Sequence, residues 1–491
     1  MSESTMPGFL NDLVHHADPA SVALLQGDRA FTYGQLVHAA TRWRDVLDPL
    51  IDEGEVVAVD FVESAFEHAA ILLAVMAAGG IHLSTRRPEA TWRRLADIGG
   101  YWHAITRKPI PPDIGPSLRS VVDIDHSVLL RPPIEPPNRP PSQHLRGRIL
   151  ETSGSSGEAK WVYWTEADLL GDRRTWTEEV GLGDQAVVLN IHPLDFAHGV
   201  DVHLLATLCA RASMVHVPGK FDPSRTLESL THHHATYMSA LPSHYEAISS
   251  SPAASTALGA HLTTAFTGGA LLSAGAAQDL FDRCAVTLKR LYGATEAGIM
   301  CADLSTHLQT RPALTPMGGV DMKIRPLPGI NFTRHQIGEP YFRRTHLATA
   351  YWADTERTTS AFSGGWYASG DAVRVATDGT LAVLGRSDDV WIDDNDTVRS
   401  ASEYVDTISR VDGIDEVVVF APSANPHHLI TVFCRLTPHE TPSVDLREKV
   451  DALVAELGET THVYYMSDWP KTAVGKPNRQ ALLAWARTTA W

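Results

Sequence analysis

The sequence has 491 residues, of which 44% are apolar and 20% are charged, and its formal net charge is −17. This composition fits a globular protein of two or more domains and excludes a chain that is disordered throughout. The excess of negative charge argues against a general nucleic-acid binder and against a polybasic membrane binder.

The N-terminus, MSESTMPGFL, lacks the basic segment and apolar core that a signal peptide shows. The cysteines lie far apart and without metal-ligand spacing, at Cys209, Cys284, Cys301 and Cys434. We therefore expect reduced thiols, a cytoplasmic protein and no membrane span.

The first part of the chain alternates strand-like and helical patterns. Residues 30–47 predict a short strand, a turn and an amphipathic helix, and residues 54–61 predict a buried strand. The longest apolar run is residues 69–81. At about 1.5 Å per residue it falls short of the roughly 30 Å hydrocarbon core of a bilayer. It predicts a buried helix that ends at Gly79 and Gly80.

Residues 131–141 are too rich in proline for a helix or a strand, so they predict a connector to a strand at residues 147–151. Beyond it, β-rich and helical runs alternate, which predicts a mainly parallel sheet. After about residue 320 the pattern turns β-rich, with a hairpin turn at Asp378 and Gly379. A final segment of about 100 residues has its own strands and helix and predicts a small α+β domain. The predicted fold class is therefore α/β.

Residues 151–160 read ETSGSSGEAK and follow an apolar strand. Glycines let the main chain approach an anion, and hydroxyls and a lysine add donors and charge. The segment is not a P-loop, because Gly154 and Gly157 are too close together and Lys160 does not follow a glycine. From these residues alone, a phosphate loop and a solvated turn both stay open.

Three further stretches follow in order, LYGATEAG at 291–298, GGWYASGDAVRVATDGTLAVLGRSDD at 364–389 and PKTAVGKPNRQAL at 470–482. With the Thr/Ser/Gly loop before them, they resemble the core motifs of the adenylate-forming superfamily of acyl-CoA synthetases, peptide-synthetase adenylation domains and luciferases. FTYGQL, TTAFTGGALLS and GEPYFRRTHLATAYW also match stretches of that family. The resemblance covers nearly the whole chain.

The resemblance implies an AMP-forming ligase that uses ATP and Mg²⁺ to join a small-molecule carboxylic acid to the α-phosphate. Pyrophosphate leaves, and the acyl group then passes to a thiol of CoA or of a carrier-protein phosphopantetheine. Because two anions must meet, positive charge and preorganised donors are needed at the phosphate. An acyl carrier protein is a candidate partner, and nucleic acid is not expected.

The motifs also imply roles for individual residues. The phosphate loop would consist of Thr152, Ser153, Gly154, Ser155, Ser156, Gly157 and Lys160. Tyr292 and Gly293 would lie by the adenine, as would the family segment matched by Gly268, Gly269 and Ala270. Thr295 would bond the α-phosphate and Glu296 would hold Mg²⁺. Asp371 would accept the ribose hydroxyls, with Arg386 assisting. Without the resemblance, each stretch reads as an ordinary turn.

Lys476 matches the C-terminal catalytic lysine of the family, and the family hinge falls at Asp388. The resemblance thus implies a large N-terminal domain at 1–387, with mainly parallel sheets, helices and a β-rich subdomain. A small mobile α+β domain at 388–491 would deliver Lys476 and exclude water on closing.

The acid pocket is expected at Phe196 and Ala197. Amino-acid-activating members usually have an aspartate at the second position, so Ala197 favours an aryl or fatty-type acid over an α-amino acid, whose buried ammonium would lack a counter-ion. Asp195 lies close enough to keep the amino-acid alternative open. Asp201 and the histidines at 192, 198 and 203 are further candidates for the pocket, or else surface or core residues.

The segment 390–399 departs from the family pattern. Ile392 replaces the usual lysine, Asn395 stands near a glycine position and Arg399 is displaced. Asn tolerates a positive φ, so the loop is still feasible. The carboxylates of Asp393, Asp394 and Asp396 would repel the phosphates of CoA unless Arg399 compensates, which favours a carrier protein as the acceptor.

Two other functions stay open, a stand-alone amino-acid-activating enzyme and a non-catalytic binding protein with this fold. The second is disfavoured because the residues expected to act on ATP are all present, namely Lys160, Glu296, Asp371, Arg386 and Lys476.

Overall fold

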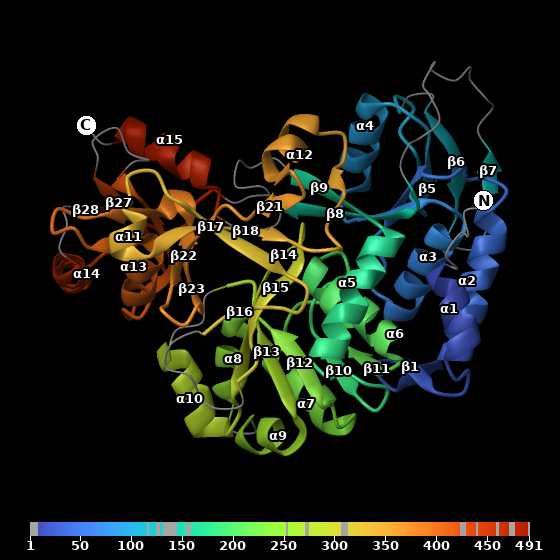
Figure 1. The fold of residues 1–491 in the computed structure, drawn as a ribbon, viewed down its shortest axis with the longest axis horizontal. Helices are drawn as coiled ribbons and strands as arrows, with labels where there is room; N and C mark the ends of the chain where they lie inside the picture. The colour runs from blue at the N-terminus through green and yellow to red at the C-terminus, as the bar shows by residue number, and fades with distance from the viewer. Residues whose placement is uncertain are drawn as a thin grey trace.

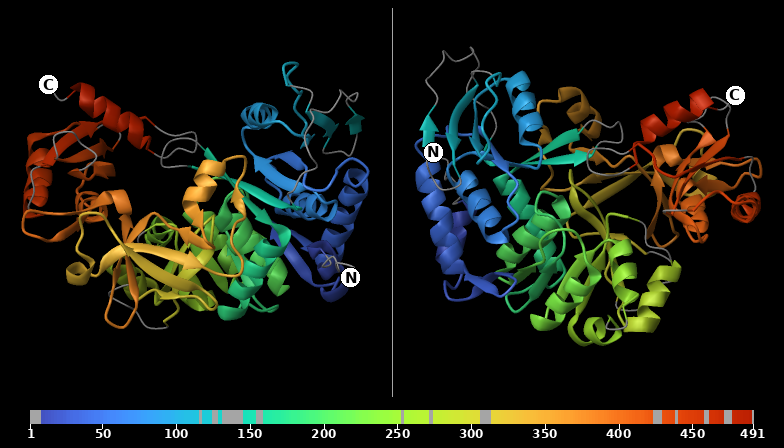
Figure 2. Two further views of the ribbon diagram at one scale, coloured as in Figure 1. Left: turned by 45° about the horizontal axis from the view of Figure 1, so that its top comes forward. Right: turned by 180° about the vertical axis from the view of Figure 1, so that it is seen from behind.

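A computed structural model describes residues 8–114, 117–123, 128–130, 145–153, 159–251, 254–270, 274–305, 313–422, 429–437, 440–457, 461–470 and 477–489. Within these ranges the strands form sheets of nine, eight, six, three and two strands. Helices α1 (Phe9–His16) and α15 (Arg479–Thr489) lie on opposite sides of the molecule (Figures 1 and 2).

The nine-stranded sheet is parallel in its centre and antiparallel at both edges. Its order is β16 (Thr315–Pro316), β15 (Gly298–Asp303), β14 (Leu288–Ala294), β13 (Thr264–Thr267), β12 (Tyr237–Ala240), β10 (Val187–Asn190), β11 (Ser213–His216), β1 (Val22–Gln26) and β2 (Arg29–Thr32). Because the carboxyl ends of parallel strands meet at one edge, this edge is where the fold places ligands.

Four helices cover the outer face of this sheet, at the bottom of Figure 1, and they are α7 (Pro223–His232), α8 (Pro242–Ser249), α9 (Ala254–His261) and α10 (Ala274–Cys284). They bury Leu230, Tyr245, Leu258 and Leu280 against the strands.

The eight-stranded sheet has a parallel centre as well. Its order is β19 (Ala350–Tyr351), β9 (Ala159–Thr165), β8 (Gly147–Ser153), β4 (Ile81–Thr85), β3 (Val56–Asp60), β5 (Trp102–Ile105), β6 (Leu118–Val122) and β7 (Val128–Leu130). Helix α4 (Pro88–Ile98) packs Trp92 and Leu95 onto its outer face.

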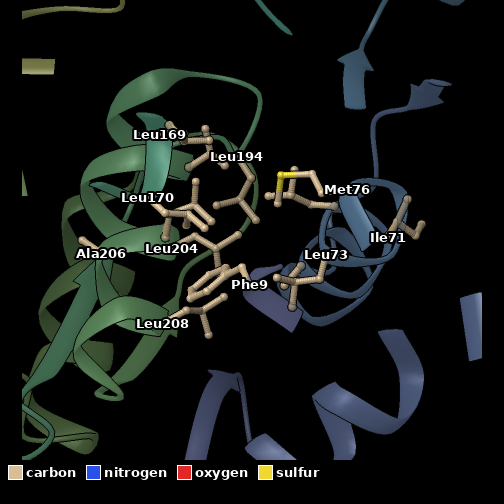
Figure 3. Close-up of a cluster of buried hydrophobic side chains, with 14 of the residues drawn as sticks. Phe9, Ile71, Leu73, Met76, Leu169, Leu170, Leu194, Leu204, Ala206 and Leu208 are labelled. Atoms are coloured by element: carbon tan, nitrogen blue, oxygen red, sulfur yellow. The ribbon is translucent and has the colours of Figure 1, made fainter. Parts of the chain in front are cut away.

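The space between the two large sheets is filled by helices α2 (Tyr33–Leu47), α3 (Ala65–Ala77), α5 (Glu166–Glu179), η1 (His198–Leu205) and α6 (Ala206–Ala210). The predicted helices are confirmed. Helix α2 begins at a capping box of Thr32 and Gln35, and α3 is buried from Ala69 to Met76. Figure 3 shows Leu73 and Met76 of α3 facing Leu194 and Leu204. The end of the predicted helical run at residue 81 instead begins β4.

The β-rich part forms an antiparallel sheet in the order β20 (Phe362–Ser363), β21 (Trp366–Ala368), β18 (Ile337–Arg343), β22 (Asp371–Val375) and β23 (Leu381–Arg386), with β17 (Asp321–Pro326) also on β18. Helices α11 (Phe332–His335) and α12 (Thr355–Ala361) flank it. The predicted hairpin is confirmed, since β22 and β23 pair and Gly379 has φ +85°.

The C-terminal part contains η2 (Ser387–Asp389), β24 (Val390–Ile392), β25 (Val398–Ser400), α13 (Ala401–Ile408), β26 (Ile414–Phe420), β27 (Ile430–Leu436), α14 (Val444–Glu456) and β28 (Thr461–Met466). Helices α13 and α14 cover one face of its three-stranded sheet and α15 covers the other. The predicted α/β fold class is confirmed. No helix among the described residues is long and apolar enough to cross a membrane.

Candidate active site

Strands β8 and β9 form the stem of the Thr/Ser/Gly segment. Thr152 pairs with Lys160 in register, and Ser153 pairs with Ala159. The tip, which contains Gly154, Ser155, Ser156 and Gly157, lies outside the described residues, so its role stays a prediction. The antiparallel stem places Lys160 directly across from Thr152, where both line one cavity.

The YGATE motif forms the turn between β14 and β15, and two glycines allow its shape. A Cβ at position 293 would lie 2.5 Å from the carbonyl oxygen of Gly298. At Gly298, where φ is +65°, a Cβ would lie 2.5 Å from a carboxylate oxygen of Asp172. Larger residues are therefore excluded at both positions. The turn between them presents Thr295 and Glu296 to the same cavity.

Residues from other elements hold the main chain of this turn. Trp164 Nε1 donates to the carbonyl of Thr295 at 2.8 Å, and the N–H of Ala348 donates to the carbonyl of Glu296 at 3.0 Å. Arg344 Nη1 donates to the carbonyl of Ala297 at 3.1 Å. The turn is thus fixed before any ligand arrives, which is the condition for electrostatic stabilisation of a transition state.

Asp371 receives two donors. Arg386 Nη1 lies 2.9 Å from one carboxylate oxygen, and the hydroxyl of Tyr292 donates to the other at 2.7 Å. Burial and the neighbouring carboxylate raise the pKa of Tyr292 well above its ordinary value, so its hydroxyl keeps its proton. The structure therefore brings together three residues that were predicted for the adenine and ribose.

Glu296 has a partner that the sequence did not indicate. The Tyr351 hydroxyl donates to Glu296 Oε1 at 2.6 Å, and burial together with this carboxylate raises the pKa of Tyr351. Tyr351 belongs to the stretch GEPYFRRTHLATAYW, which matched the family without pointing to a role for it.

Glu296 fits the ligand expected for Mg²⁺. Its side chain lines the cavity although the residue is only 9% exposed, and Oε2 has no hydrogen-bond or ion-pair partner among the described residues. Carboxylate oxygens are the protein ligands that Mg²⁺ prefers. In the described ranges no group of three or more His, Cys, Asp or Glu side chains could hold a metal. A cation here would therefore complete its shell with phosphate and water oxygens.

A cavity of about 560 Å³ joins these elements. Of the predicted site residues it is lined by Thr152, Lys160, Gly293, Thr295, Glu296, Asp371 and Arg386. Glu339, Tyr351 and Tyr367 line it as well and were not predicted. Glu339 accepts the N–H of Gly370 at 2.9 Å, which fixes the main chain beside Asp371.

The C-terminal motif reaches the same cavity. Pro477, Asn478 and Arg479 line it, and Arg479 Nη2 lies 2.6 Å from Asp389 Oδ1, beside the predicted hinge residue Asp388. Lys476 lies outside the described residues, so its catalytic role stays a prediction. Arg479 was overlooked although its position in PNR adjoins the lysine.

Other predicted residues do not line this cavity. A Cβ at Gly268 would lie 3.1 Å from the carbonyl oxygen of Leu291, the residue before Tyr292, and Gly269 has φ +78°. Ala270 is exposed. Phe196 is 43% exposed and Ala197, half-buried, precedes η1. Their contact with adenine or acid stays a prediction.

Helix η1, which has π-type hydrogen bonding, carries His198 and His203, and together with His192, which lies between β10 and η1, they form a histidine wall. Such helices are rare and recur at functional sites. His198 Nε2 lies 2.7 Å from the hydroxyl of Ser239, and the rings of His192 and His198 stack with centroids 4.0 Å apart. The N–H of Ser239 donates to His203 Nε2, so His203 carries its proton on Nδ1, which donates to the carbonyl of His198. Burial lowers the pKa of His203 to about 4 and those of His192 and His198 well below 6.5, so the wall is neutral.

The carboxylates near this wall are paired with arginines. Asp195 accepts two hydrogen bonds from Arg86, at 2.6 and 3.0 Å, and the guanidinium of Arg86 lies 3.6 Å above the ring of Phe61. Asp201 is buried in an ion pair with Arg148. Neither carboxylate is free to serve as the counter-ion of a substrate ammonium.

The segment 390–399 differs from the interpretation that three carboxylates would repel CoA. Burial alone would raise the pKa of Asp393. The N–H groups of Thr397 and Asn395 and the guanidinium of Arg399 outweigh this effect, so the pKa of Asp393 is lowered. Asp396 pairs with Arg334 and His335. The positive φ, +59°, also falls at Asp396 and not at Asn395. Only Asp394 projects into solvent without such a partner in the described part of the chain, so the charge argument against CoA fails.

Comparison with known proteins agrees with this architecture. The chain is 28% identical to pyochelin synthetase PchE of Pseudomonas aeruginosa over 75% of its own length and 26% of that protein. It is 27% identical to feruloyl-CoA synthase of Amycolatopsis sp over 54% of its own length and 55% of that protein. The chain thus spans about a quarter and about half of these relatives.

A solved structure shares the whole fold. The anthranilate CoA ligase AuaEII, in complex with anthranoyl-AMP, superposes with a TM-score of 0.80 at 21% identity and covers 100% of both chains. A family model described as AMP-binding enzyme matches residues 125–352, from before the Thr/Ser/Gly segment to the residue after Tyr351. Residues 125–352 therefore match the AMP-binding enzyme family, in agreement with the motifs that resemble the adenylate-forming superfamily.

Proposed function

We propose that this protein is an AMP-forming ligase that converts a carboxylic acid and ATP to an acyl-adenylate and pyrophosphate, and then transfers the acyl group to a thiol. One observation carries the proposal. A single cavity of about 560 Å³ gathers a lysine at a Ser/Gly-rich hairpin, a fixed Thr295–Glu296 turn and the Asp371–Arg386 pair.

In this mechanism, a carboxylate oxygen attacks the α-phosphorus and the bond to the bridging oxygen of pyrophosphate breaks. Lys160 and the loop donors bind the departing phosphates, Thr295 donates to the α-phosphate and Asp371 accepts from the ribose hydroxyls. Glu296 Oε2 would hold Mg²⁺, which supplies charge neutralisation on the phosphates when bound. Lys476 would stabilise the charge that builds between carboxylate and phosphate.

The acid is proposed to be an aryl carboxylic acid. The imidazoles of His192, His198 and His203 are neutral and bring no charge to the expected acid pocket at Ala197. Asp195 and Asp201 are held by arginines, so an α-ammonium group would enter without a counter-ion, at a cost of order several kcal/mol. Feruloyl-CoA synthase and the anthranilate CoA ligase are named for aryl acids, which supports the same class.

The acceptor is proposed to be the thiol of phosphopantetheine, either in CoA or on a carrier protein. A second cavity, of about 370 Å³, adjoins the histidine wall and is lined by Arg86, Lys220, His192 and His244. Lys220 has no anionic partner among the described residues, so this cavity offers a cation for an acceptor phosphate. We propose domains at 1–387 and 388–491, with rotation at Asp388 exposing the adenylate to the thiol.

The test is a panel of aryl, fatty and α-amino acids offered with Mg²⁺ and ATP, followed by pyrophosphate release and mass spectrometry of the acyl-adenylate. We expect turnover with one or more aryl acids, followed by thioester formation with CoA or a holo carrier protein. Turnover of α-amino acids alone would contradict the substrate class, and no adenylate with any acid would contradict the function.

A further inference from the structure

We propose that Tyr351 is a positioning residue that keeps Glu296 and Lys160 apart and correctly aimed for the metal and phosphates of bound ATP. The proposal rests on the proposed adenylation function. It starts from two contacts of one side chain. The hydroxyl donates to Glu296 Oε1 at 2.6 Å, and the ring lies 5.1 Å from Lys160 Nζ.

The hydroxyl fixes the orientation of the carboxylate. A neutral donor on Oε1 restrains the rotation of the Glu296 side chain while Oε2 stays without a partner in the described structure. Both residues are nearly buried, at 5% exposure for Tyr351 and 9% for Glu296, so few water molecules compete for the contact. A charge-assisted hydrogen bond of this kind is among the stronger ones in proteins.

The ring fixes the ammonium. A cation within about 6 Å of a ring centroid is attracted by the negative face of the aromatic system. The contact holds Lys160 beside Glu296 without forming an ion pair between them. No ion pair joins Lys160 to Glu296 in the part of the chain that the structure describes. A direct pair would neutralise both groups and would have to break before ATP and its cation could bind.

The main chain around Tyr351 explains how one side chain can reach both groups. Tyr351 pairs with Val162 of β9, the strand that carries Lys160, and Trp352 donates to the carbonyl of Trp161 at 2.7 Å. Three residues earlier, the N–H of Ala348 donates to the carbonyl of Glu296 at 3.0 Å. Residues 348–352 therefore connect the β8–β9 hairpin, which carries Lys160, to the Thr295–Glu296 turn.

The test compares Tyr351→Phe, which loses only the hydroxyl, with Tyr351→Ala, which also loses the ring. Tyr341→Phe serves as the control, because the hydroxyl of Tyr341, on β18, accepts an exposed hydrogen bond from Arg325 of β17. For Tyr351→Phe we expect the Mg²⁺ concentration at half-maximal rate to rise about tenfold, with kcat at saturating Mg²⁺ within about threefold of wild type. Tyr351→Ala should in addition raise the KM for ATP.

A second readout does not depend on turnover. Titration of Mn²⁺ into the protein with ATP, followed by electron paramagnetic resonance, should show about tenfold weaker binding for Tyr351→Phe than for wild type and Tyr341→Phe. Thermal unfolding of each variant checks that it is folded. Unchanged Mg²⁺ dependence and unchanged Mn²⁺ binding in folded Tyr351→Phe would overturn the proposal. If wild type adenylates no acid, the proposed function fails, and the Mn²⁺ titration still decides the role of Tyr351.

Discussion

At the scale of single residues, the candidate site depends on how each charge is paired. Asp371 lines the cavity, and Tyr292 and Arg386 align its carboxylate by donating to different oxygens. Asp195 is held entirely by Arg86 through two hydrogen bonds. Asp371 is therefore accessible to a ligand, whereas Asp195 is not.

Replacing Asp371 by Asn should raise the KM for ATP about tenfold or more, because a carboxylate that accepts two ribose hydroxyls becomes a weaker, neutral acceptor. The KM for the acid should stay nearly constant. Asp378→Asn is the matched control, since Asp378 lies in the exposed turn of the same hairpin. Steady-state pyrophosphate release checks both, and an unchanged KM for ATP in Asp371→Asn would contradict the ribose assignment.

Replacing Ala197 by Asp should lower kcat/KM for the best aryl acid about 100-fold. The new carboxylate would lie unpaired beside the acid, a cost of order several kcal/mol unless it takes up a proton. Ala197→Ser changes size and polarity without adding charge and should retain most of the activity. If Ala197→Asp uses the aryl acid as well as wild type does, Ala197 is not in the acid pocket.

At the scale of elements, η1 and the strands around it concentrate neutral histidines between the large sheets. Burial lowers the pKa of His203 on η1 to about 4, and burial and His203 lower that of His216 on β11 to about 4. In the unfolded chain both would titrate near 6.5. The unfolded state therefore binds more protons than the folded state between about pH 4 and pH 6.5.

Stability should consequently fall as pH drops through this window. From pH 7 to pH 5 the loss is about 2 kcal/mol for each of these histidines. Thermal unfolding should show a markedly lower Tm at pH 5 than at pH 7. His216→Gln should reduce the difference, whereas exchanging the exposed His15 for Gln should not. A Tm that is constant from pH 7 to pH 5 would contradict the buried neutral state.

The elements were largely predictable because their patterns are local. The capping box before α2, the apolar run of α3 and the turn at Gly379 are each encoded within a few residues. Pairings between distant residues were not predictable. Arg86 and Asp195 are 109 positions apart, and Tyr351 and Glu296 are 55 apart. The motifs indicated residues that line the cavity of about 560 Å³. Which partner each charged side chain has could be seen only in the folded structure.

At the scale of the whole molecule, the β24–β25 hairpin of the C-terminal part packs against the β-rich sheet and the segment around α11. Val390 and Val398 of the β24–β25 hairpin pack against Ile330 and Ile337, and Asp396 pairs with Arg334 at its rim. The ion pair is largely exposed and worth at most about 1 kcal/mol. The proposed rotation at Asp388 would have to separate these apolar contacts and this ion pair.

The proposed catalytic role of Lys476 belongs to this scale, because the C-terminal part has to deliver it. Lys476→Ala should lower adenylation about 10²–10³-fold, the effect of losing one transition-state stabiliser. Binding of ATP measured by calorimetry should change little. Lys471→Ala, in the same motif, is the control. Equal rates for Lys476→Ala and wild type would show that the lysine was assigned incorrectly.

The central claim is that a carboxylate oxygen attacks the α-phosphate of ATP. The most direct measurement uses an acid labelled with ¹⁸O in both carboxylate oxygens, with a thiol acceptor present, and follows the products by mass spectrometry. Attack at the α-phosphorus, followed by transfer of the acyl group to the thiol, leaves one carboxylate oxygen on AMP. We therefore predict AMP that contains a single ¹⁸O, together with unlabelled pyrophosphate. ADP with ¹⁸O in orthophosphate would show attack at the γ-phosphorus and would contradict the account.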